Sequence, residues 1–496
     1  MNYILSALSS VFSPFGLLFN ALGVLLGIIF GALPGLNGVV GVALLLPLTY
    51  SMAPEYGLIM LSGLYMGATY GGSISAILLN CPGTGEAACT ALNGNPMAKQ
   101  GKAKEALYYS LFASAIGGIF GAIIMLCFTP ILAKMALKFG PPELFLVSVM
   151  GLAVVGSLMG NSLAKGMFSV AFGLILSIVG MDVTSVNFRF TFNNMYLQSG
   201  LSLIPVSVGF FAIAEMLDLM TKKDDSELIA QKFSNTKAST IFKDVLKRWK
   251  ILLKSSLIGT IIGILPGTGG AIASFISYGE AKRSSKESTL FGKGAPDGII
   301  APEVANNAAV GGSFVPLLSL GIPGSATSAI IFGALTVHGM IPGPKLFSEH
   351  TDTVYALMIG LIVSVLFMVL LGVAGTGIFS KILKVKTKYI IPAVLAFSIL
   401  GAYSARNSVF DIAVAIFFGI VGLLFKKAGI PVAPAVLGMI LRSMAEQNLR
   451  QSMVIASAKS MNLFKYIVFR PISIVLIVLI GLLLIGNIKT NLRGKE

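Results

Sequence analysis

Charged residues are scarce in this 496-residue chain, at 11% of the total, against about 25% in an ordinary soluble protein. Hydrophobic residues make up 55%, and the mean hydropathy is +0.88. A chain of this length with so little charge cannot cover a water-facing surface, which excludes a soluble enzyme, a nucleic-acid-binding protein and a disordered scaffold. The composition therefore predicts a polytopic membrane protein.

Histidine and cysteine are also rare. The two histidines argue against a metal or redox enzyme, and the three cysteines, which lack CxxC spacing, supply neither a disulfide framework nor a metal site. The sequence contains no P-loop, HExxH or GxSxG motif, so ATP hydrolysis and common hydrolase chemistries have no visible apparatus. We expect a protein that is not an enzyme and needs no cofactor.

Basic residues outnumber acidic ones by 36 to 20. Beside apolar spans, this excess indicates cytoplasmic loops and contact with anionic membrane lipid, with no nucleic-acid partner. It is concentrated in residues 221–254, interpreted as a basic cytoplasmic linker between a first membrane repeat (1–220) and a second (255–487), with a cytoplasmic tail (488–496). The N-terminus lacks the basic region and cleavage site of a signal peptide, so we expect it in the mature protein.

Long apolar runs recur along the whole chain. Candidate spans or half-spans cover approximately residues 15–33, 36–50, 57–80, 106–132, 143–160, 166–182, 200–220, 253–279, 301–322, 325–341, 353–380, 389–403, 409–425, 430–447 and 471–487. Several are interrupted by Pro-Gly pairs. We expect an all-α polytopic membrane protein with about 11–12 transmembrane helices plus Pro-Gly-broken hairpins.

Two motifs recur in the same order in the two halves. Residues 27–38 and 259–270 share the pattern GxxxGxLPGxxG, and a Gly-Gly-Ser followed by Pro-Gly occurs in both 71–84 and 311–325. The chain is therefore predicted to be an internal duplication.

The loop charges indicate how the two repeats are oriented. The loop at 51–56 contains only an acidic residue whereas its counterpart at 280–300 is basic. The next loop in the first half, at 99–104, is basic, but its counterpart at 345–352 is not. Because cytoplasmic loops carry the basic residues, this exchange predicts two inverted structural repeats.

Four Pro-Gly pairs fall in or beside apolar runs, at 34–35, 82–83, 266–267 and 323–324. Such pairs break a helix, and broken helices in two inverted halves are a pointer to the binding site of a secondary transporter. The freed N-termini suit an anion. We predict substrate-binding residues at the second and fourth breaks: Pro82, Gly83, Thr84, Gly85, Pro323, Gly324 and Ser325. The alternative is that each pair is only a turn between short helices.

Oxygen-bearing residues near the other two breaks suit a small cation. We predict cation binding by Asn37, Gly38, Thr268 and Gly269, and coupling to Na⁺ or H⁺ by Glu86, Glu303, Asn306 and Asn307. The alternatives are that the small polar residues cap helices and that the glutamates pair with basic residues. Arg442 and Arg450 flank Glu446 at helical spacing, which predicts an ion-paired helix face.

These motifs carry a resemblance to a known family. The segments that carry it are 31–38 (GALPGLNG), 70–103, 264–270 (ILPGTGG), 302–335 and 430–453. Together they resemble the large permease subunit (TctA) of the tripartite tricarboxylate transporters over about residues 20–452. Arg442 departs from the family pattern, where we expect a small residue.

The resemblance implies a multi-pass permease of the bacterial inner (cytoplasmic) membrane that imports tricarboxylates or related carboxylates by Na⁺ or H⁺ symport. It implies two partners, a small four-helix membrane subunit (TctB-like) and a periplasmic solute-binding protein (TctC-like). Two alternatives stay open: a stand-alone carboxylate transporter, and a non-transporting membrane subunit that docks a periplasmic binding protein.

Overall fold

A computed structural model describes residues 2–33, 36–158, 163–182, 187–221, 236–267, 269–378 and 387–481. Within these ranges the chain is almost entirely helical, and one short antiparallel strand pair, Gly180–Met181 (β1) with Phe188–Arg189 (β2), interrupts the helices. Five of the described helices are long and apolar enough to cross a membrane, and six more are apolar but shorter. The predicted all-α polytopic membrane fold is confirmed.

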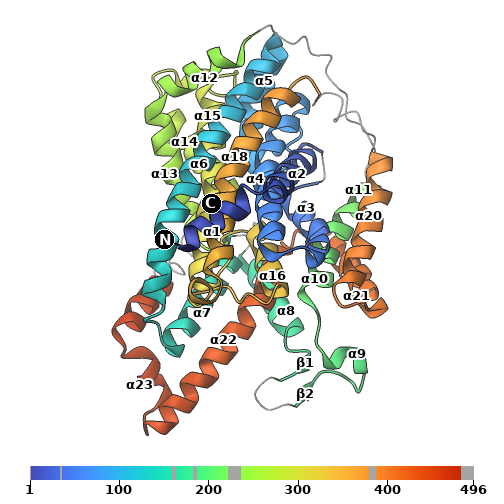
Figure 1. The fold of residues 1–496 in the computed structure, drawn as a ribbon, viewed down its shortest axis with the longest axis vertical. Coiled ribbons are helices and arrows are strands. Elements are labelled where there is room, and N and C mark those ends of the chain that lie inside the picture. Colours follow the sequence, from blue (N-terminus) through green and yellow to red (C-terminus); the bar gives the residue numbers. More distant parts are fainter. Residues whose placement is uncertain are drawn as a thin grey trace.

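The helices up to residue 221 occupy the blue to green part of the chain (Figure 1). They are α1 (Asn2–Val11), α2 (Pro14–Ala32), α3 (Gly38–Leu45), η1 (Leu46–Ser51), α4 (Pro54–Leu79), η2 (Gly85–Ala87), α5 (Ala88–Met97), η3 (Ala98–Lys102), α6 (Ala103–Ala136), α7 (Pro141–Leu158), α8 (Leu163–Leu176), α9 (Met195–Gln198), α10 (Leu203–Ser207), η4 (Val208–Ile213) and α11 (Ala214–Thr221).

The helices of the second part begin after the basic stretch. They are α12 (Ala238–Lys247), α13 (Trp249–Ile264), α14 (Gly269–Ser284), η5 (Ser288–Leu290), α15 (Asp297–Leu320), α16 (Ala326–Val337), α17 (Leu346–Glu349), α18 (Thr351–Gly375), α20 (Thr387–Ser404), α21 (Val409–Lys427), α22 (Ala433–Ala458) and α23 (Leu463–Val468).

Glycines hold the central helices in backbone contact. On α2, a Cβ atom added at Gly31 would lie 2.2 Å from the Ala68 carbonyl oxygen of α4. On α13, a Cβ at Gly263 would lie 2.5 Å from the Ala309 carbonyl oxygen of α15. Such close approach is possible only without a side chain. The two copies of the glycine motif therefore make equivalent contacts, α2 with α4 and α13 with α15.

Segments of the two halves contact each other at two of the predicted loop regions. Near α5 and α12 (Figure 1), the Gln100 side chain donates a hydrogen bond to the Lys293 carbonyl oxygen at 2.8 Å. Elsewhere, His338 Nε2 lies 3.3 Å from Thr49 Oγ1. The basic loops of the two halves thus lie together, and so do the loops poor in basic residues.

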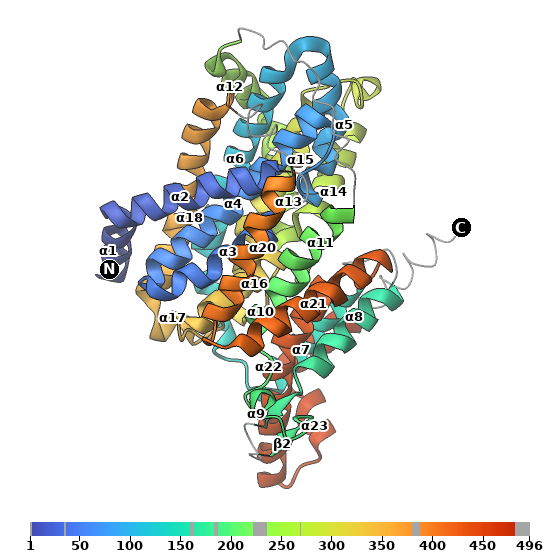
Figure 2. The same cartoon turned by 90° about the vertical axis from the view of Figure 1, so that its right-hand side faces the viewer.

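The part of the molecule at the lower end of Figure 1 contains α22, α23, α9 and the strand pair, and Figure 2 shows it projecting below the main helices. Arg442 and Arg450 both pair with Glu446 of the same helix, as predicted. Arg189 of β2 also pairs with Glu446, at 3.0 Å. Arg442 additionally donates to the Ser177 carbonyl oxygen at 3.2 Å. The network ties the strand pair to α22.

Candidate functional site

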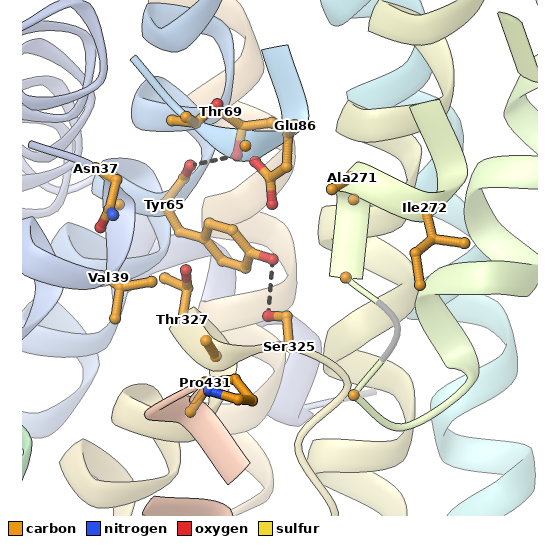
Figure 3. A pocket seen from close by; sticks show the side chains of 18 of the residues that line it. Asn37, Val39, Tyr65, Thr69, Glu86, Ala271, Ile272, Ser325, Thr327 and Pro431 are labelled. Atoms are coloured by element: carbon orange, nitrogen blue, oxygen red, sulfur yellow. Dashed lines mark hydrogen bonds between the residues drawn. The ribbon is translucent and has the colours of Figure 1, made fainter. Parts of the chain in front are cut away.

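A cavity of about 490 Å³ lies between segments from the two halves of the chain (Figure 3). Its volume is in the range of small-molecule sites. The two halves line it with matching segments. The lining residues are Asn37, Gly38, Val39, Tyr65, Thr69, Thr84, Gly85, Glu86, Gly267, Gly269, Gly270, Ala271, Ile272, Ser325, Ala326, Thr327, Pro431, Val432 and Ala433.

Helix N-termini make up much of this lining. Among the described residues, α3, the continuous η2–α5 segment, α14, α16 and α22 all begin at the cavity wall. Three of the five carry a side-chain cap: Asn37 accepts from the Val40 N–H at 3.0 Å, Thr84 from the Ala87 N–H at 3.3 Å, and Ser325 from the Ser328 N–H at 3.1 Å. A cap satisfies one N–H and leaves others of the first turn free, so the cavity wall is rich in hydrogen-bond donors and in positive dipole ends.

The Pro-Gly turns lie directly behind two of these N-termini. Helix α4 is capped at its C-terminal end by Asn80, and α15 by Gly321, and both residues are in the left-handed conformation. After each of these two helices, the chain turns through a Pro-Gly pair into the next helix. A Cβ at Gly83 would lie 1.9 Å from the Gly31 carbonyl oxygen, and one at Gly324 would lie 2.6 Å from that of Gly263. Glycine is required at both turns because a neighbouring helix backbone passes there.

The predicted substrate-binding residues divide into two sets. Thr84, Gly85 and Ser325 line the cavity. Pro82, Gly83, Pro323 and Gly324 are not among its lining residues, and they shape the turns that place the others.

Of the predicted cation-binding residues, Asn37, Gly38 and Gly269 line the cavity. Thr268 lies outside the described residues, as do Pro34 and Gly35 of the first break. The described members stand at helix starts, where they present N–H donors.

Tyr65 and Thr69 on α4 were not anticipated from the sequence. Both line the cavity, and the Tyr65 hydroxyl lies 2.9 Å from the Ser325 hydroxyl of the opposite half (Figure 3). No local signal singles them out, because the same helix also carries Ser62, Tyr70 and Ser73. Pro431, Val432 and Ala433 at the start of α22 were also missed, since no local pattern sets them apart.

Glu86 is the one charged side chain among the described lining residues. It is half-buried, and its carboxyl carbon lies 3.1 Å from the position of a Cβ added at Gly270. Glu86 Oε1 lies at the same distance from that position, so the carboxylate stands against the start of α14. A helix N-terminus is a favourable place for a carboxylate, and an anionic ligand would make the same interaction.

The other predicted coupling residues lie outside the cavity lining. Glu303, Asn306 and Asn307 are fully buried on α15. Thr90 of α5 and Ser114 of α6 donate hydrogen bonds to the two oxygens of Glu303, Ser114 at 2.8 Å. Within the described ranges, no lysine, arginine or histidine pairs with Glu86 or Glu303, so the alternative of a basic partner finds no support there.

Comparisons with known proteins agree with this architecture. The family model of the tripartite tricarboxylate transporter TctA family matches residues 17–437. The chain is 36% identical over 449 residues to an uncharacterized 52.8 kDa protein in the TAR-I ttuC' 3' region of Agrobacterium vitis, covering 90% of this chain and 89% of that protein. It is 37% identical over 198 residues to an uncharacterized protein in the TAR-II ttuC' 3' region of the same organism, covering 40% and 82% respectively.

No solved structure matches the chain. The family model covers most of the sequence, and the longer relative aligns over nearly its whole length. The chain therefore belongs to the tripartite tricarboxylate transporter TctA family, a family of membrane transporter components and not of enzymes.

Proposed function

We propose that this protein is the large permease subunit of a binding-protein-dependent secondary transporter that imports tricarboxylates or related carboxylates. The observation that carries the proposal is the convergence of helix N-termini on one cavity whose described lining includes no lysine, arginine or histidine. Backbone N–H groups and dipole ends attract carboxylates without a fixed positive charge. Such binding is strong enough to admit an anion and weak enough to release it, as transport requires.

The matching lining from the two halves supports alternating access. Residues 37–39 and 84–86 line the cavity from the first half, and residues 269–271 and 325–327 occupy the equivalent positions of the second. In transporters built from inverted repeats, the solute site lies at the repeat interface and the halves open it to each side in turn. We propose the same cycle here, across the bacterial inner membrane and driven by a Na⁺ or H⁺ gradient.

The family supports the proposed partners. A tripartite system has two further components, and we propose a small four-helix membrane subunit and a periplasmic solute-binding protein that delivers the carboxylate. A stand-alone transporter would not need the binding protein. A docking subunit would not need the cavity.

Uptake into vesicles tests these proposals. The chain is reconstituted with its small membrane subunit, and labelled citrate uptake is measured under an inward Na⁺ or proton gradient, with and without the binding protein. We expect uptake that requires the binding protein and one of the gradients. Uptake without the binding protein would indicate a stand-alone transporter. Absence of uptake for citrate and for a panel of di- and tricarboxylates that bind the binding protein would contradict transport.

A matched pair of variants on α14 ties uptake to the cavity. Ala271 lines the cavity, whereas Gly279 stands on the same helix with open space around its Cβ position. Ala271→Leu should abolish uptake by filling the site, and Gly279→Leu should leave uptake near the parent rate. Equal uptake by both variants would place the solute path elsewhere.

A further inference from the structure

A carboxylate is buried one layer away from the cavity, where three helices meet. Glu303 on α15 is inaccessible to solvent, and its two carboxylate oxygens accept hydrogen bonds from Thr90 on α5 and Ser114 on α6. Ser110, one turn before Ser114, lies 2.6 Å from the Ser73 hydroxyl of α4. The carboxylate is thus surrounded by hydroxyl oxygens.

The charge of Glu303 has no basic counterpart in the described part of the chain. Within the described ranges, no basic side chain forms an ion pair with it. An isolated buried carboxylate is strongly unfavourable unless it is neutralised. A bound cation or a proton must therefore compensate it.

An unsatisfied amide stands beside the carboxylate. Asn307, one turn after Glu303 on the same face of α15, donates through Nδ2 to the Glu303 carbonyl oxygen at 3.0 Å and to Asn306 Oδ1 at 2.9 Å. Its own Oδ1 is buried and has no hydrogen-bond partner, and neither has the buried Nδ2 of Asn306. Buried polar atoms without partners are unusual in a folded protein, and a bound ion or water molecule at this place would satisfy them.

We propose that Glu303, Thr90, Ser114 and Asn307 bind the coupling cation, and that this cation is Na⁺. All of the donor atoms are oxygens, one of them charged, which is the set that hard cations prefer. If a proton on Glu303 compensated the charge instead of a cation, it would need only one acceptor, and the Asn307 side-chain oxygen would stay without a partner. The inference rests on the proposed function, in which transport is ion-coupled. This assignment differs from the predicted cation site at Asn37, Gly38 and Gly269, because the N–H donors at those helix starts favour an anion.

The site is connected to the cavity through one helical segment. Glu86, which lines the cavity, and Thr90, which contacts Glu303, are one turn apart in the continuous Gly85–Ala136 segment. A cation held by Glu303 and Thr90 fixes the start of this segment, and with it Thr84 and Gly85 at the cavity wall. Cation binding therefore favours the arrangement that binds the solute, which is the thermodynamic requirement for coupling.

Sodium binding to the purified full chain tests this inference without any carboxylate present. Equilibrium binding of ²²Na⁺ is measured together with thermal unfolding in NaCl and in choline chloride at equal ionic strength. We expect saturable binding of one Na⁺ per chain and a Tm that rises with Na⁺ concentration, because a ligand that binds only the folded state stabilises it. Glu303→Gln and Thr90→Val should weaken Na⁺ binding at least about tenfold.

Glu55→Gln is the matched control, because it removes a carboxylate at the start of α4, outside the cavity lining, and leaves the Glu303 cluster intact, and it should bind Na⁺ like the parent. Ser114→Ala is a second, smaller change for the case in which Glu303→Gln does not fold. Unchanged Na⁺ binding in the Glu303, Thr90 and Ser114 variants would overturn the inference, as would a parent chain whose Tm ignores Na⁺. Intact Na⁺ binding in a chain that moves no carboxylate would contradict only the proposed function.

Discussion

The Tyr65 hydroxyl of α4 lies 2.9 Å from the Ser325 hydroxyl at the start of α16, so one hydrogen bond joins the two halves of the chain across the cavity wall. Both side chains are buried, at 2% and 4% exposed. Ser325 also accepts from the Ser328 N–H, so the same oxygen caps α16 and contacts the opposite half. The position of this helix N-terminus is therefore set by a residue of the other repeat.

Removal of this hydrogen bond should affect carboxylate uptake more than the stability of the fold. We expect Tyr65→Phe to lower the free energy of unfolding by about 0.5–1.5 kcal/mol, the usual worth of a neutral hydrogen bond. We also expect a raised KM for carboxylate uptake, because the start of α16 loses its fixed position. Tyr403→Phe, at a 40% exposed tyrosine, is the control. Parent-like KM in Tyr65→Phe would show that the contact does not position the site.

Alanine substitutions at Gly83 and Gly85 should distinguish a glycine that helix packing requires from one that it does not. At Gly83 the new Cβ would lie 1.9 Å from a backbone oxygen, so we expect Gly83→Ala to destabilise the fold by about 1–3 kcal/mol or more. Gly85, two residues later on the cavity wall, has nothing within 4 Å of its Cβ position. Gly85→Ala should therefore melt like the parent. Thermal unfolding in detergent measures both, and equal Tm values would contradict the close approach.

Neutralising Glu86 should strengthen carboxylate binding. The carboxylate of Glu86 occupies the start of α14 and repels a second negative charge. We expect Glu86→Gln to bind carboxylates several-fold more tightly than the parent, measured by equilibrium binding of labelled citrate. Glu55→Gln, at the start of α4 and outside the cavity lining, is the control. Weaker binding in Glu86→Gln would mean that Glu86 holds the solute through a bridging cation.

The Arg442 network should contribute modestly and in a salt-dependent way. Arg442 and Glu446 are 22% and 25% exposed, and pairs of this kind are worth about 0–1 kcal/mol each. We expect Arg442→Gly, which also lowers helix propensity, to reduce Tm at low salt. The electrostatic part of that loss should shrink in 1 M KCl, where charges are screened. A loss that grows with salt would exclude ion pairing as the cause.

Local chemistry in the sequence was enough to predict several residues that line the cavity, and their role in binding stays a prediction. Thr84 and Ser325 follow Pro-Gly pairs and have side chains suited to capping, and both indeed start helices at the cavity. The repeated glycine motif predicted the duplication because close helix packing needs small residues at fixed spacing.

The rest depended on contacts between distant segments. Tyr65 reaches the site only because α4 packs beside α16, and the start of α22 joins it from more than a hundred residues beyond Ser325. Glu303 and Glu86 looked alike in the sequence, as lone acidic residues in apolar surroundings. Only the packing of α5, α6 and α15 separates them, by burying one and leaving the other at the cavity.

The glycine contacts have a consequence for movement. Helices α2 and α4 touch backbone to backbone, as do α13, α15 and α6, where a Cβ at Gly117 would lie 2.1 Å from the Val304 carbonyl oxygen. Helices in such contact cannot slide along each other without first separating, so each group must move as a rigid body. Any reorientation of the cavity then occurs between these bodies, and the Pro-Gly turns at Gly83 and Gly324, which pack against the Gly31 and Gly263 carbonyl oxygens, move with them.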